Sequence, residues 1–80
     1  MSAEALEHLV KGIVEHPEDV VVTERENRRR GDSITVRVNP DDMGRVIGRG
    51  GRTATALRTV VKAVAGGRPI RIDFLDVGER

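Results

Sequence analysis

The chain has 80 residues, of which 38% are hydrophobic and 34% are charged, and its formal net charge is +1. This length predicts one domain, and the absence of cysteine excludes disulfides, thiolate nucleophiles and cysteine metal sites. No apolar stretch approaches the roughly 20 residues of a membrane-spanning helix, and the first residues lack the pattern of a secretion signal. We therefore expect a cytoplasmic protein with no membrane segment.

The charges are distributed unevenly along the chain. Residues 1–27 carry seven acids and two bases, whereas residues 43–72 carry seven bases and no acid. Arg28, Arg29 and Arg30 form a separate basic cluster between these regions. A polyanion is the natural partner for such basic regions, although an ordinary solvated surface is the alternative interpretation.

The first half of the chain predicts one helix and two strands. Ser2 is suited to cap a helix that continues to His16-Pro17, where the residue before proline avoids helical geometry. The apolar residues of this helix follow a helical spacing: Leu6, Leu9, Val10, Ile13 and Val14. Residues 20–23 are all β-branched and predict a strand, and residues 26–32 predict a loop. Residues 33–38 alternate polar and apolar side chains, which predicts a strand with Ile34, Val36 and Val38 on one face.

The second half predicts two helices and a last strand. Asn39 and Pro40 are typical of a helix start, and the short helix that follows has an apolar side made by Met43, Val46 and Ile47. A further helix begins near Arg52 or Thr53 and ends at Gly66-Gly67. Its expected apolar face consists of Ala54, Leu57, Val60, Val61 and Val64. Residues 70–74 alternate as a strand, and residues 77–80 are expected to form a flexible tail.

Helix, strand, strand, helix, helix, strand is therefore the expected order. Three strands that share one apolar face, covered by three helices, form a two-layer α+β domain. We expect residues 1–80 to form this single domain.

Residues 48–51, Gly48-Arg49-Gly50-Gly51, lie between two predicted helices and are called the glycine turn below. A dinucleotide-binding fingerprint requires a third glycine where Thr53 stands, and a strand immediately upstream. A phosphate-binding loop of the GxxxxGK[ST] type is also absent. The remaining pattern is helix, GxxG, helix.

A GxxG pattern has two interpretations. The glycines can serve only to make a tight turn between helices. Alternatively, they allow a sugar-phosphate backbone to approach the chain, with Arg45, Arg49 and Arg52 around the turn and the amides of the next helix facing the anion. Val46 and Ile47 would then offer an apolar step to unstacked bases.

Residues 46–54, with the sequence VIGRGGRTA, resemble the core motif of K-homology (KH) domains, in which a GxxG loop clamps about four nucleotides. The order αββααβ resembles the type II arrangement of this fold. A lone KH domain of this size, with LRTVVKA at residues 57–63, is similar to the small bacterial KhpA family. The resemblance implies a single-stranded RNA-binding protein and an RNA chaperone. It also implies a larger KhpB-like partner and a link to cell elongation and envelope homeostasis.

The resemblance also implies roles for individual residues. Gly48 and Gly51 would be the motif glycines, Arg49 the phosphate contact, and Ile47 the floor of the groove with Val46 nearby. Arg28, Arg29 and Arg30 would lie in the variable loop that forms the opposite jaw of the same groove. Gly50 departs from the polar or basic residue more usual at its position, which predicts modest affinity.

The residues offer little for catalysis or metal binding. His8 and His16 have no neighbouring ligands in the sequence, and no nucleophile stands beside a base. We therefore expect neither an enzyme nor a bound metal or cofactor. Two hypotheses remain: RNA binding through the glycine turn, and a dimerisation or protein-interaction module that uses the apolar side of the short helix, at Met43 and Ile47.

Overall fold

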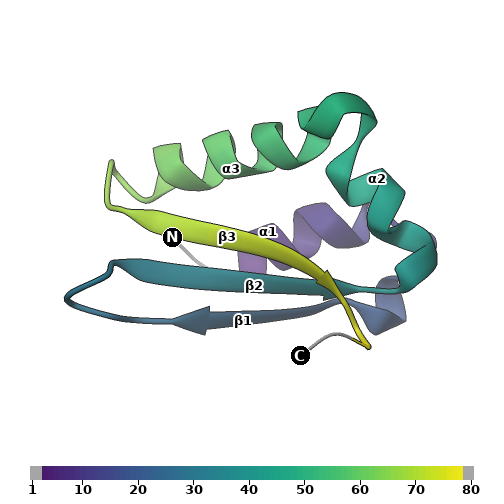
Figure 1. Cartoon of the computed structure of the whole chain (residues 1–80), viewed down its shortest axis with the longest axis horizontal. Helices are drawn as coiled ribbons and strands as arrows, with labels where there is room; N and C mark the ends of the chain where they lie inside the picture. The colour runs from purple at the N-terminus through teal and green to yellow at the C-terminus, as the bar shows by residue number, and fades with distance from the viewer. Residues whose placement is uncertain (1–2, 79–80) are drawn as a thin grey trace.

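The computed structural model describes residues 3–78, which form three α-helices, three strands and three short 3₁₀ turns (Figure 1). The helices are α1 (Ala3–Lys11), α2 (Met43–Ile47) and α3 (Arg52–Val64), and the strands are β1 (Val21–Arg25), β2 (Asp32–Val38) and β3 (Ile70–Asp76). The 3₁₀ turns are η1 (Pro17–Asp19), η2 (Pro40–Asp42) and η3 (Arg49–Gly51). The predicted order αββααβ is confirmed.

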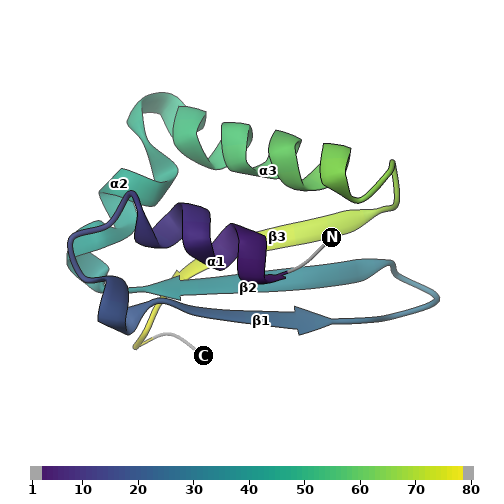
Figure 2. The ribbon, with the colours of Figure 1, turned by 180° about the vertical axis from the view of Figure 1, so that it is seen from behind.

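The sheet is mixed, with β2 in the centre. β1 pairs with β2 in the antiparallel direction, and β3 pairs with β2 in parallel through the long crossover that contains α2 and α3. Figures 1 and 2 show the helices gathered on one side of this sheet. The predicted two-layer α+β architecture is therefore confirmed.

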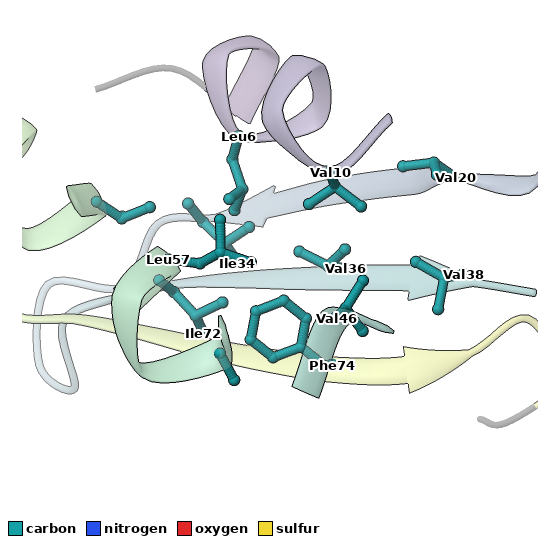
Figure 3. Close-up of a cluster of buried hydrophobic side chains, with 12 residues drawn as sticks. Leu6, Val10, Val20, Ile34, Val36, Val38, Val46, Leu57, Ile72 and Phe74 are labelled. Atoms are coloured by element: carbon teal, nitrogen blue, oxygen red, sulfur yellow. The ribbon is translucent and has the colours of Figure 1, made fainter. Parts of the chain in front are cut away.

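The core lies between the sheet and the helices (Figure 3). Ile34, Val36 and Val38 of β2 are all buried, as their alternation predicts. They pack in one cluster with residues of the three helices and of β3: Leu6 and Val10 of α1, Val46 of α2, Ala54, Leu57 and Val61 of α3, and Ile72 and Phe74 of β3, together with Val20 before β1. A single hydrophobic core thus fixes how α2 and α3 are placed relative to the sheet.

The first helix is shorter than predicted. It ends at Lys11, because Gly12 is a poor helix former, and the amide of Gly12 already donates to the carbonyls of both His8 and Leu9. Ile13 and Val14 still pack against the core, but from a turn rather than from the helix. The predicted cap at Ser2 lies outside the described residues.

Three residues predicted on apolar helix faces are exposed instead: Leu9, Val60 and Val64. Each directly precedes a buried residue: Val10 in α1, Val61 in α3, and Ala65, the residue that caps the C-terminus of α3. Successive residues of a helix are rotated by about 100°, so a residue one step from the buried row lies on the flank. The apolar faces contacting the sheet are therefore narrower than the sequence pattern indicates.

The bounds of β1 and β3 differ slightly from the predicted ones. Val20 is buried but precedes β1, which extends to Arg25 rather than ending at Thr23. β3 continues to Asp76, and the Val77 amide donates to the Val38 carbonyl at 2.9 Å. Within the tail predicted for residues 77–80, only Val77 and Gly78 belong to the described residues.

Candidate nucleic-acid interface

The segment before α2 is fixed by a side-chain cap. The Asn39 side chain accepts a hydrogen bond from the Asp41 amide at 2.8 Å, and Pro40 opens η2, as the sequence predicts. η2 leads directly into α2, and α2 leads into the glycine turn. The cap at Asn39 therefore helps to set the direction of α2. The Asn39 amide group also donates to Asp19 at 2.9 Å, which joins this start to η1.

Asp42 is the one charged residue buried among the described residues, with an exposed fraction of 1%. Its carboxylate accepts the backbone amides of Glu15 at 3.1 Å and His16 at 3.0 Å, and His16 Nδ1 lies 3.1 Å from Oδ2. These bonds form a clamp between the segment after α1 and the start of α2. The buried charge is thereby fully hydrogen-bonded, as a buried carboxylate must be.

The clamp changes the ionisation of both partners. The hydrogen bond to Asp42 raises the pKa of His16 above its ordinary value. Burial by itself would raise the pKa of Asp42, but the hydrogen bonds from Glu15 and His16 outweigh it and lower that pKa. Both shifts favour an ion pair of imidazolium and carboxylate.

Gly48 ends α2 and cannot carry a side chain. Its φ is +77°, and a Cβ added there would lie 2.8 Å from the backbone N of Thr53 and closer still to Thr53 Oγ1. The first turn of α3 is therefore packed directly against this glycine. The structure gives Gly48 a packing role whatever the turn binds.

The other two glycines of the turn face open space. Gly50 and Gly51 also have positive φ angles, +64° and +77°, but a Cβ at either position would meet nothing within 4 Å. Gly51 is the N-cap of α3 and supplies no side-chain hydrogen bond to the helix amides. The N-terminus of a 13-residue helix thus lies behind a turn with no side chains between Arg49 and Arg52, which suits an approaching anion.

The three arginines around the turn are not equivalent. The Arg45 guanidinium forms an ion pair with Glu15, so part of its charge is already neutralised. Arg49 and Arg52 are exposed and have no ion-pair partner among residues 3–78. Of the predicted phosphate contacts here, Arg49 and Arg52 are the two that are free to bind.

The apolar step before the turn consists of one residue rather than two. Val46 is fully buried in the core, so its predicted position beside the bases must be corrected. Successive residues of a helix are rotated by about 100°, so Val46 points at the sheet while its neighbour Arg45 points away from it. Ile47 is half-buried and is the residue of this pair that reaches the surface.

Arg28, Arg29 and Arg30 do not lie across a groove from the glycine turn, which corrects the predicted arrangement of two jaws. Their loop adjoins the loop between α3 and β3, where it lines a hollow together with Arg68 and Pro69. Figure 1 shows the β1–β2 loop at the end of the molecule opposite α2. The reason is the sheet register, which pairs Asp32 at the start of β2 with Ile70 at the start of β3.

Sequence reasoning missed the roles of Asp42, His16 and Arg58. Asp42 closely follows the helix start at Asn39 and Pro40, and nothing in the sequence indicates a partner 26 residues away. Arg58 spans the space between α3 and β3, where Nη2 lies 3.3 Å from the Ile72 carbonyl and the guanidinium lies 5.3 Å from the Phe74 ring centre. In the sequence, Arg58 is one of several basic residues of a predicted helix, and no local pattern predicts its contact with β3.

Two further observations concern the described part of the chain. None of its helices has the length and apolar character needed to span a bilayer. Residues 3–78 also contain no group of three or more His, Cys, Asp or Glu side chains placed to hold a metal ion.

The geometry above agrees with the comparisons to known proteins. The family model "KhpA/KhpB, KH domain" matches residues 3–74. "RNA-binding protein KhpA" of Streptomyces coelicolor is 65% identical over 77 residues, which cover 96% of this chain and 95% of that protein. The proteins of the same name from Leifsonia xyli and Mycobacterium bovis are 59% and 57% identical, each over 95% of this chain and over 99% and 92% of their own lengths. No solved structure was found to match. The chain belongs to the KhpA/KhpB family of KH domains.

Proposed function

We propose that this protein binds single-stranded RNA and that the glycine turn is the contact with the sugar-phosphate backbone. The observation that supports this most directly is the open surface at Gly50 and Gly51, which leaves the start of α3 accessible between two unpaired arginines. The names of the relatives, which describe RNA-binding proteins, support the same ligand.

Each part of the turn has a distinct role in this proposal. Gly48 holds α3 against α2, so the amides at the α3 start keep a fixed position. Arg49 and Arg52 contact phosphates on either side, and half-buried Ile47 contacts a base. Because Arg45 is paired with Glu15, it contributes less to binding than Arg49 does. Recognition of the phosphate backbone predicts weak sequence selectivity.

The wider role that the family resemblance implies is part of the same proposal. We place the protein in the cytoplasm as an RNA chaperone and post-transcriptional regulator, acting with a KhpB-like KH-containing protein and linked to cell elongation and envelope homeostasis. A turn that grips phosphates without reading many bases is suited to a chaperone, because such a protein must bind many RNAs and release them. Binding without catalysis is what this role requires.

The test is the double variant Arg49→Asp and Gly50→Asp. We expect its affinity for single-stranded RNA to fall by more than about tenfold, because two negative charges then face the phosphates. The far-UV circular dichroism spectrum should not change, since Arg49 is exposed and a Cβ at Gly50 would meet nothing within 4 Å. Lys11→Asp, on α1, is the control for a general loss of positive charge. Unchanged RNA affinity in the double variant would refute the proposal.

A second candidate function is contact with another copy of the chain. Met43 and Ile47 are partly buried against the core, so the predicted contact surface there offers little apolar area to a partner. Val60 and Val64 of α3, by contrast, are exposed. Sedimentation velocity of Val60→Glu and Ile47→Ala, with and without RNA, locates the contact. A dimer lost only in Val60→Glu, with RNA binding retained, supports α3. A monomeric unaltered protein contradicts the candidate.

A further inference from the structure

We propose that the outer surface of the sheet is a docking surface for a partner protein, which presents to it an acidic side chain flanked by apolar ones. This surface is called the open face, and it is the side of the sheet that the helices leave bare in Figures 1 and 2. Its main feature is a row of one residue from each strand, Val21, Arg37 and Leu75, called the Arg37 row below. The inference goes beyond RNA binding and does not depend on it.

The alternation of side chains along each strand places the Arg37 row on the open face. In β2, the buried Val36 and Val38 face the helices, so Arg37 between them points the other way. The other two residues of the row are each next to a residue that packs in the core, Val22 in β1 and Phe74 in β3. The three side chains therefore lie side by side on the surface, on strands about 4.8 Å apart.

The Arg37 row places a cation between two aliphatic side chains. Val21 is 50% exposed, Leu75 is half-buried, and Arg37 is half-buried without an ion-pair partner within residues 3–78. A carboxylate that reached this guanidinium would form its ion pair between apolar side chains, where a lower dielectric strengthens the attraction. The planar guanidinium can also bind both oxygens of one carboxylate. Arg37 is therefore well placed to bind an acidic side chain that has apolar neighbours.

A shallow hollow extends from the Arg37 row along the sheet. Thr23 and Thr35 line it in the next row, where the register aligns them with Asp73. The Asp73 carboxylate is already engaged, since Arg71 Nε lies 3.1 Å from its Oδ2. The two hydroxyls can donate and accept hydrogen bonds with a docked chain. The free charge beside them is that of Arg37, so the hollow suits a segment that carries a negative charge.

The charges of the open face favour an acidic partner over a second copy of this chain. Three arginines line the hollow, Arg25, Arg37 and Arg71, and Asp73 is the one acid among its lining residues. Two copies packed face to face would bring these arginines against one another, and such like-charge contacts cost free energy. A partner that carries carboxylates would instead provide the complementary charge.

A protein suits the Arg37 row better than an RNA strand does. Phe74 is the one aromatic residue of the chain and is buried, so the open face has no ring on which a base could stack. The row contains a single guanidinium for a phosphate, and its aliphatic side chains offer phosphates nothing. An arginine surrounded by apolar area is instead typical of the centre of protein interfaces.

The open face and the glycine turn can be occupied at the same time. The glycine turn joins α2 and α3 on the helix side of the sheet, whereas the open face is the opposite side (Figure 1). A partner docked on the open face would therefore leave the turn accessible. With RNA at the turn, the protein would connect that RNA to the docked partner.

The experiment uses the full chain in the cells that make it, with a photoreactive phenylalanine derivative in place of Thr35. Irradiation should crosslink it to a partner protein, and mass spectrometry of the joined peptide should show a Glu or Asp flanked by apolar residues. Arg37→Gln should lower the yield by about tenfold, because it removes a charge-assisted contact. Val21→Thr keeps a β-branched residue but removes a methyl group, and should lower the yield by about threefold. The same probe in place of His8, on α1, is the control and should not give this product.

An exchange of charges tests the contact itself. Arg37→Glu should abolish the crosslink, and changing the acidic residue of the partner to Arg should restore it. The RNA affinity of Arg37→Gln should stay within about twofold of that of the unaltered protein, with the same far-UV circular dichroism spectrum. The Arg49→Asp, Gly50→Asp variant should retain the crosslink, so failure of the RNA proposal is a separate result. A crosslink to RNA or to a second copy, a crosslink that Arg37→Gln does not weaken, or no crosslink at position 35 would each refute the docking surface.

Discussion

The two ends of α3 carry two different kinds of surface. At its N-terminal end, the glycine turn exposes backbone, namely glycines without side chains and helix amides, and it is flanked by Arg49 and Arg52, which have no ion-pair partner within residues 3–78. At its C-terminal end lies a basic surface, the arginine end, to which the β1–β2 and α3–β3 loops and the adjoining ends of β1, α3 and β3 together contribute seven basic side chains: Arg25, Arg28, Arg29, Arg30, Lys62, Arg68 and Arg71. Figure 2 shows how the length of α3 keeps these ends apart.

The two ends should therefore respond differently to mutation. The glycine turn depends on its backbone conformation, so a single added methyl group can disrupt it. A side-chain site depends on the number of charges, so it should weaken gradually as charges are removed. Stability and binding should therefore be coupled at the glycine turn and largely independent at the arginine end.

The largest effect is expected from Gly48→Ala. The new Cβ would collide with Thr53, and alanine would be held at a positive φ, so we expect a loss of about 2–5 kcal/mol in the free energy of unfolding. A small domain has little stability to spare, so this variant can be largely unfolded. Urea denaturation followed by circular dichroism measures the loss.

Gly50→Ala and Gly44→Ala are the matched controls for Gly48→Ala. Gly50 has a positive φ but open surroundings, so its substitution should cost only about 1–2 kcal/mol. Gly44 lies within α2 with nothing near its Cβ position, and alanine there should stabilise the protein by about 0.5–1 kcal/mol. Equal losses at all three positions would show that Gly48 has no special packing role.

The clamp near the glycine turn is expected to make stability depend on pH. The pKa of His16 is raised by its hydrogen bond to Asp42, so its contribution is complete below its ordinary value of 6.5 and is lost as pH rises through the raised pKa. The pKa of Asp42 is lowered, so its contribution is present above 3.8 and is lost as pH falls through the lowered pKa. The clamp should stabilise the fold most between these limits.

The variant His16→Gln tests this dependence. Its urea midpoint should fall furthest below that of the unaltered protein between about pH 4 and 6.5, and the difference should shrink as pH rises further. His8→Gln, at an exposed position of α1, is the control for the loss of a histidine outside the clamp. A constant difference between the two proteins across this range would contradict a role for His16 ionisation.

Local patterns in the sequence were sufficient to predict most of the fold. The alternation of Ile34, Val36 and Val38 identified the inner face of the sheet, and Asn39-Pro40 placed the start of the second helical segment. These patterns succeed because period and capping are properties of neighbouring residues. The glycines of the turn were located for the same reason.

What the sequence could not predict depends on contacts between distant segments. The partners of Asp42 lie 26 and 27 residues away, and the neighbour of the triple-arginine loop is fixed only by the pairing of β2 with β3. Helical periodicity also could not show that α3 contacts the sheet through a row too narrow to include Val60. Two basic regions were recognised, but their separation required the tertiary structure.

Arg58 lies midway between the two ends and should affect stability rather than binding. Arg58→Ala removes the bonds to the Ile72 carbonyl and the contact with Phe74, for an expected loss of about 1–2 kcal/mol and a fall in Tm of about 4–16 °C. The salt slope of RNA binding should stay unchanged, since its guanidinium is already engaged. A smaller slope would instead make Arg58 a third phosphate contact.

The smallest effect is expected from Glu15→Gln, which releases Arg45 at the edge of the glycine turn. Both side chains of this ion pair are more than half exposed, so its loss should change stability by less than about 1 kcal/mol. The freed Arg45 should then strengthen RNA binding by up to about threefold and steepen the salt slope by less than about 0.7. The Glu15 amide still donates to Asp42 in this variant, so the clamp is preserved. If RNA affinity rises in Glu15→Gln but not in Glu15→Gln with Arg45→Gln, the gain belongs to Arg45. If RNA affinity rises equally in both variants, the gain comes from removal of the acid alone. RNA affinity at the turn would then depend on the net charge nearby rather than on a contact by Arg45.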